Sequence, residues 1–69
     1  EQKVGTYEII IASIPDREKC VAEIWFDGSM LAEVNHETDE FIVEFFCDMK
    51  SKYRLDDVIE SLSIARSKL

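Results

Sequence analysis

The hydrophobic period of this chain changes near residue 50, and that change restricts the possible folds. Before it, apolar and polar residues alternate in four runs, at 6–14, 19–26, 29–35 and 40–47. Alternation with a period of two is typical of strands, because successive side chains point to opposite faces of a sheet. After it, apolar residues recur at the three-and-four spacing of an amphipathic helix over 55–68, namely Leu55, Val58, Ile59, Leu62, Ala65 and Leu69.

The four runs are joined by short connections, so we expect neighbouring strands to pair in an antiparallel meander. At Asp27-Gly28 we expect a three-residue loop that includes Phe26 and pairs Ile24 with Met30, because a two-residue loop would bring Glu33 to the core side. The sequence therefore predicts one α+β domain, residues 1–69. Its fold is a four-stranded antiparallel β-meander with one C-terminal α-helix packed on one face, in the order ββββα.

Alternate residues of a strand point to opposite faces of the sheet, so the sequence predicts which residues lie on each of two different faces. One is almost wholly apolar, and we expect the helix to cover it: Tyr7, Ile9, Ile11, Ser13, Cys20, Ala22, Ile24, Met30, Ala32, Val34, Phe41, Val43, Phe45 and Cys47. The other mixes carboxylates with apolar groups: Glu8, Ile10, Ala12, Ile14, Val21, Glu23, Trp25, Leu31, Glu33, Ile42, Glu44 and Phe46. No segment of the chain remains to cover this second face.

Charge narrows the class of partner. The net charge is −7, and residues 1–48 carry twelve acidic and three basic residues. Phosphates would be repelled, which disfavours nucleic acid and anionic lipid and favours a basic protein. The longest apolar run, Ile9 to Ala12, is too short to cross a bilayer, and the start of the chain has no secretory signal pattern. We therefore expect a cytoplasmic protein that contacts no membrane.

Catalytic and metal-binding patterns are scarce. The one histidine, His36, lies in an expected turn without a second imidazole or thiolate near it in the sequence. Cys20 and Cys47 fit no metal or redox spacing, and we expect both to be small buried hydrophobic residues. No phosphate loop or nucleophile motif is present. We expect no enzyme activity, no catalytic residue, no metal and no cofactor.

The second face is the predicted binding surface, because an aromatic anchor among acidic groups suits a basic protein. The candidate residues are Glu8, Glu23, Trp25, Glu33, Ile42, Glu44 and Phe46, with Asp39 and Glu40 in the preceding loop. A structural alternative is that the apolar members only pair with each other across strands while the glutamates keep the face soluble.

Four segments resemble small bacterial immunity proteins of contact-dependent growth inhibition and related polymorphic toxin systems. They are Tyr7 to Ile11, Val21 to Gly28, Leu31 to Val34 and Leu55 to Leu62. The resemblance implies a cytosolic protein that binds a cognate toxin domain, often a nuclease, and blocks it. Two alternatives stay open. One is a HicB-type antitoxin, since the opening strand is also similar to that fold. The other is a homo-oligomer module in which the Trp25 face pairs with itself.

Overall fold

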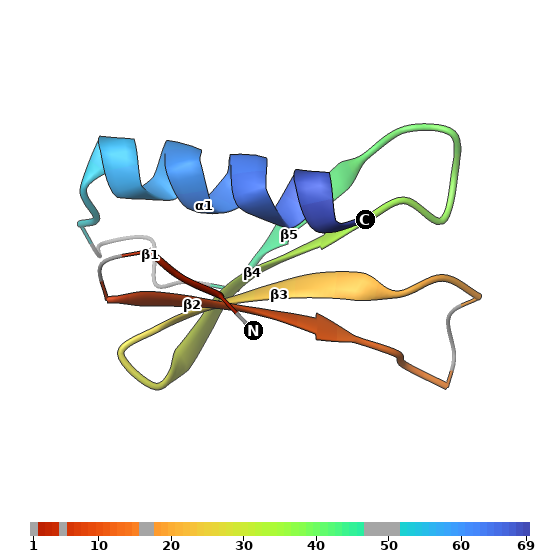
Figure 1. Cartoon of the computed structure of the whole chain (residues 1–69), viewed down its shortest axis with the longest axis horizontal. Coiled ribbons are helices and arrows are strands. Elements are labelled where there is room, and N and C mark those ends of the chain that lie inside the picture. Colours follow the sequence, from red (N-terminus) through yellow and green to blue (C-terminus); the bar gives the residue numbers. More distant parts are fainter. Residues whose placement is uncertain (1, 5, 16–17, 47–51) are drawn as a thin grey trace.

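The described part of the chain forms a five-stranded antiparallel sheet with one helix across it (Figure 1). The computed structural model describes residues 2–4, 6–15, 18–46 and 52–69 of the chain. The elements are β1 (Gln2–Val4), β2 (Tyr7–Ala12), β3 (Val21–Phe26), β4 (Ser29–Asn35), β5 (Ile42–Phe45) and α1 (Leu55–Lys68). The strands lie in chain order, β1-β2-β3-β4-β5.

The predicted α+β fold, an antiparallel meander followed by a C-terminal helix, is confirmed. The helix begins and ends where the periodicity places it. Strand β1 is an addition to the prediction, because three residues are too few to show a period. The observed β2, β3 and β5 are also shorter than the alternating runs. Cys47, at the end of the fourth predicted strand, lies outside the described residues.

The hairpin between β3 and β4 differs from the prediction. Phe26 pairs with Ser29, so the loop has two residues, Asp27 and Gly28. Both have positive φ, 50° and 81°, as a type I′ turn requires. The register then shifts between Ile24 and Trp25, so that Ile24 pairs with Ala32 rather than with Met30.

With a two-residue loop alone, Glu33 would point to the core side of the sheet. This β-bulge keeps Glu33 on the opposite face, so the longer loop that we expected is not needed. One extra residue in β4, Leu31, lies between the pairs Trp25–Met30 and Ile24–Ala32. Leu31 joins the buried core, and Met30 lies opposite Trp25. The prediction had exchanged these two residues between the faces, because alternation alone does not reveal a bulge.

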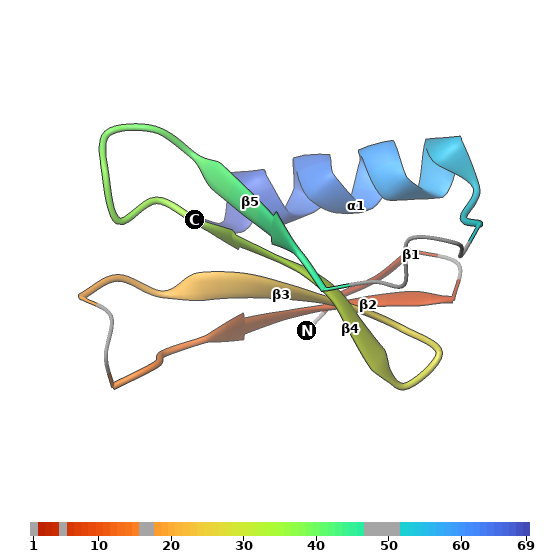
Figure 2. The ribbon, with the colours of Figure 1, turned by 180° about the vertical axis from the view of Figure 1, so that it is seen from behind.

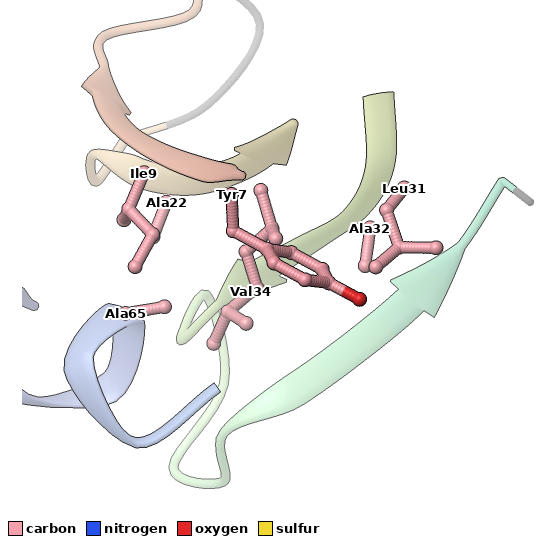
Figure 3. Close-up of a cluster of buried hydrophobic side chains, with 8 residues drawn as sticks. Tyr7, Ile9, Ala22, Leu31, Ala32, Val34 and Ala65 are labelled. Atoms are coloured by element: carbon pink, nitrogen blue, oxygen red, sulfur yellow. The ribbon is translucent and has the colours of Figure 1, made fainter. Parts of the chain in front are cut away.

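The core lies between α1 and the central strands (Figure 3). Its buried side chains come from β2, β3, β4 and α1, and they are Tyr7, Ile9, Ala22, Ile24, Leu31, Ala32, Val34 and Ala65. The helix buries its small residues Ser61 and Ala65 completely. The Ser61 hydroxyl donates to the Val58 carbonyl oxygen at 2.9 Å, so this buried polar group is satisfied within the helix.

Two parts of the predicted core are exposed instead. Leu55 and Ile59 of α1 are 70% and 53% exposed, because the helix turns its narrow side, with Ser61 and Ala65, toward the sheet. The helix packs on β1 to β4 and makes no comparable contact with β5. A helix is roughly 10–12 Å wide, whereas five strands spaced about 4.8 Å apart span nearly twice that. One helix therefore packs on the first four strands and leaves the last strand without comparable helix contacts. Figure 2 shows this strand, β5, at the edge of the sheet.

Candidate protein-binding surface

The sheet face opposite α1, which we call the open face, carries a row of carboxylates. Strand register places Glu23 of β3 opposite Glu33 of β4, and Glu33 opposite Glu44 of β5. Ile10 of β2 lies opposite Glu23 and continues the row toward the other edge. The predicted acidic residues of three different strands are thus brought side by side.

Trp25 lies next to this row. Its indole Nε1 donates a hydrogen bond to Glu23 Oε1 at 3.1 Å, and its strand neighbours are Glu8 and Met30. The indole, Glu8 and Glu23 are all half-buried. The hydrogen bond orients the Glu23 carboxylate along the face and leaves its second oxygen outside this contact. A large apolar ring beside an oriented carboxylate is a suitable anchor for a partner with basic and apolar groups.

The open face is not evenly exposed. Glu33 is 6% exposed, as is Asn35, and Val21 is fully buried although it lies on this side of the sheet. Glu44 and Ile42 of β5 are exposed. The most exposed part of the predicted site therefore lies toward β5, Glu23 and Trp25 remain partly accessible, and Glu33 is nearly covered.

The segment from Phe41 to Phe46 is the most exposed apolar part of the chain within the described ranges. All six residues are exposed, and five of them are apolar. Ile42 and Glu44 belong to the open face, while Val43 and Phe45 pair with core residues of β4 and so belong to the helix face. Phe46 follows β5, is 51% exposed, and donates its backbone N–H to the Leu31 carbonyl oxygen at 2.8 Å.

The loop before β5 supplies the other predicted acidic residues. Asp39 and Glu40 are exposed, and Glu40 N–H donates to Thr38 Oγ1 at 3.2 Å in a local turn. Glu37 has a different role, because its carboxylate accepts hydrogen bonds from the backbone N–H groups of Glu18 and Lys19 at 3.1 and 3.0 Å. The Glu37 side chain therefore connects the β4–β5 loop to the β2–β3 loop through two hydrogen bonds.

An apolar pocket of about 150 Å³ opens on the helix face beside β5. It is lined by Val34, Phe41, Ile42, Val43, Leu62 and Arg66. The ring of Phe41 stacks on His36 with 5.4 Å between centroids, and Arg66 Cζ lies 5.1 Å from the centre of the same ring. The predicted loop histidine is therefore packed against an aromatic ring. Alternation had placed Phe41 in the core, and only the position of α1 shows that it borders a pocket.

Cys20 was expected to be buried and is exposed. It precedes β3, whose ladder with β2 begins at Val21, so no described strand lies beside it. Within the described ranges, His, Cys, Asp and Glu side chains nowhere gather in a group of three or more suited to a metal ion. In the same ranges no helix combines the length and the apolar character that crossing a bilayer requires.

The chain was compared with protein-family models, with curated proteins and with solved structures, and nothing in these three comparisons matches it.

Proposed function

We propose that the chain is a non-catalytic, cytoplasmic protein-binding domain that neutralises a cognate basic toxin domain, as an immunity protein does. The observation that carries the proposal is the register that lines up Glu23, Glu33 and Glu44 across three strands beside Trp25. Such a row attracts cationic groups and speeds association with a basic protein. Exposed Ile42 supplies apolar area at the β5 end of the row.

The net charge of −7 supports the same class of partner. A nuclease domain presents basic groups where it binds phosphates, so an acidic face can occupy that surface in place of the substrate. The resemblance to immunity proteins noted for the sequence agrees with this role. No chemical step by the chain itself is needed, since occupying the surface is enough to inhibit.

The test uses the protein encoded by the reading frame immediately upstream of this chain. We expect that protein to stop growth when it is expressed alone, and growth to recover when this chain is co-expressed. Isothermal titration calorimetry with the purified pair then gives the affinity. An upstream protein that is harmless, or that fails to bind this chain, contradicts the proposal.

A matched pair of variants locates the surface. Glu23→Lys on the open face and Glu60→Lys on the exposed side of α1 change the net charge by the same amount. We expect Glu23→Lys to weaken the affinity at least about 10-fold and Glu60→Lys to change it less than about 3-fold. Trp25→Ala should weaken it like Glu23→Lys. Equal losses in the two lysine variants would show that net charge alone acts, and would remove the open face as the site.

A further inference from the structure

Strand β5 has one paired and one unpaired side. The backbone N–H of Phe46 donates to the Leu31 carbonyl oxygen on β4. Backbone N–H and C=O groups alternate in direction along a strand, so those of Glu44 and Ile42 also point toward β4. Those of Val43 and Phe45 must then point away from the sheet. No other described segment pairs with them. An edge of this kind is a template for another strand.

The helix-face side chains of this edge form an apolar row. Phe41, Val43 and Phe45 are 43%, 40% and 55% exposed. Leu55 and Ile59 of α1 add exposed apolar surface on the same side of the molecule. Natural edge strands are usually protected by charges, prolines or a covering element. In this row Arg66 of α1 lies over the ring of Phe41, while Val43 and Phe45 remain substantially exposed. Such a row predicts that a strand with apolar side chains at alternate positions will add to β5.

The pocket beside β5 has the size of one aromatic ring. A cavity of about 150 Å³ lined by apolar side chains holds a benzene molecule, and the pocket beside Phe41 has that volume. An added strand that carries a phenylalanine opposite Phe41 would place its ring at the mouth of this pocket. A strand that matches this edge of β5 therefore carries apolar side chains at alternate positions and a phenylalanine at one end.

We propose that two copies of this chain pair through β5, antiparallel about a two-fold axis at Val43. In this register Val43 lies opposite Val43 of the second copy, and Phe41 lies opposite the second copy's Phe45. Each copy places the Phe45 ring at the mouth of the other copy's pocket, so the contact is self-complementary as a two-fold interface requires. The two sheets become one, with both helices on the same face.

Charge selects this register over its neighbour. A two-fold axis at Glu44 would place the two Glu44 side chains directly opposite each other, which is unfavourable. It would also place Phe45 opposite Val43 instead of Phe41 and leave the pocket unfilled. With the axis at Val43, Glu44 lies opposite Ile42.

The exposed area is enough for a reversible dimer. The six residues from Phe41 to Phe46 together expose on the order of 500 Å² per copy, which is the most that the pairing can cover and the lower limit of specific interfaces. We therefore expect a dissociation constant in the micromolar range. The inference does not need the proposed function, since the dimer leaves both open faces uncovered and joins them into one continuous surface.

The experiment is sedimentation equilibrium of the purified chain alone, from about 1 to about 500 µM, which spans the expected dissociation constant. We expect the average mass to rise from monomer toward dimer. Phe45→Ala should weaken the dimer at least about 30-fold, as for an anchor residue in its pocket. The control is Ile11→Ala, which also truncates an exposed apolar side chain of the helix face but lies on β2. This variant should change the dimer dissociation constant less than about 3-fold.

A second variant tests the backbone pairing. Val43→Pro removes only the N–H that points away from β4, so the monomer should keep its circular dichroism spectrum while the dimer is lost. Glu44→Gln tests the register, and it should change the dimer affinity no more than Glu60→Gln, which removes the same charge on the exposed side of α1. A chain that stays monomeric through the whole range overturns the proposal. So does a dimer that survives Phe45→Ala and Val43→Pro. A dimer strengthened more by Glu44→Gln than by Glu60→Gln overturns the register.

Discussion

Tyr7 places a polar hydroxyl group within the apolar core. It is 1% exposed, its ring packs on Phe26 with 4.9 Å between centroids, and Phe26 in turn packs on Tyr53. No described group accepts or donates a hydrogen bond at its buried hydroxyl. Burial raises the pKa of Tyr7 above its usual value of 10.0, and the nearby Asp57 and Tyr53 raise this pKa further. Its side chain lies among the buried side chains of the core (Figure 3). The phenol is thus held neutral at a small cost in hydrogen bonding.

Replacing this hydroxyl should therefore show in the stability of the domain. Tyr7→Phe should raise the free energy of unfolding at neutral pH by up to about 1 kcal/mol, because a buried unsatisfied group is removed and the ring contacts remain. Above about pH 10 the unfolded chain releases the Tyr7 proton more readily than the folded chain does, so the wild type should lose stability as pH rises and the variant should lose less. Urea unfolding at pH 7 and at pH 10.5 measures both effects. A variant less stable than the wild type at pH 7 would show that the hydroxyl has a partner.

At the scale of elements, the β3–β4 hairpin sets which side chains reach each face. Its two-residue turn places Asp27 and Gly28 at positive φ, and the bulge at Leu31 then restores the parity of the residues that follow. The bulge keeps Glu33 on the open face and brings Leu31 into the core. The carboxylate row therefore depends on a turn and a bulge that compensate for one another.

The turn can be tested without disturbing any contact. A Cβ added at Gly28 would meet no atom within 4 Å, so the cost of Gly28→Ala is conformational and should be about 1 kcal/mol of unfolding free energy. A synthetic chain with D-alanine at this position should recover that loss, since D-residues favour positive φ. Thermal unfolding of the three chains measures the difference. Equal losses with L- and D-alanine would mean that φ at this position is not the cause.

At the scale of the whole molecule, charge separates the two proposed interactions. Each copy carries −7, so two copies repel each other, whereas the chain and a basic partner attract. Added salt screens both effects. Self-pairing and partner binding should therefore respond to salt with opposite signs.

This difference is measurable on the wild-type chain. Between about 0.05 and 0.5 M NaCl we expect the dimer dissociation constant to fall and the dissociation constant for the basic partner to rise, the latter by 10-fold or more. Sedimentation and calorimetry in the same buffers give the two constants. Partner binding that does not weaken with salt would argue against an acidic docking face. A dimer that weakens with salt would argue for charge pairing between copies in place of apolar pairing.

The periodic pattern alone determined the meander, the helix over 55–68 and most of the two-face division, because a period of two or of 3.6 is a local property of the chain. It placed Trp25, Glu23 and Glu44 on one face, as the register shows. The tertiary structure decided what is not local. A bulge exchanged Met30 and Leu31 between the faces, and a helix narrower than the sheet left β5 uncovered. Whether an apolar residue is buried thus depends on whether α1 packs over it. Phe41, Val43 and Phe45 were expected in the core and are exposed for this reason.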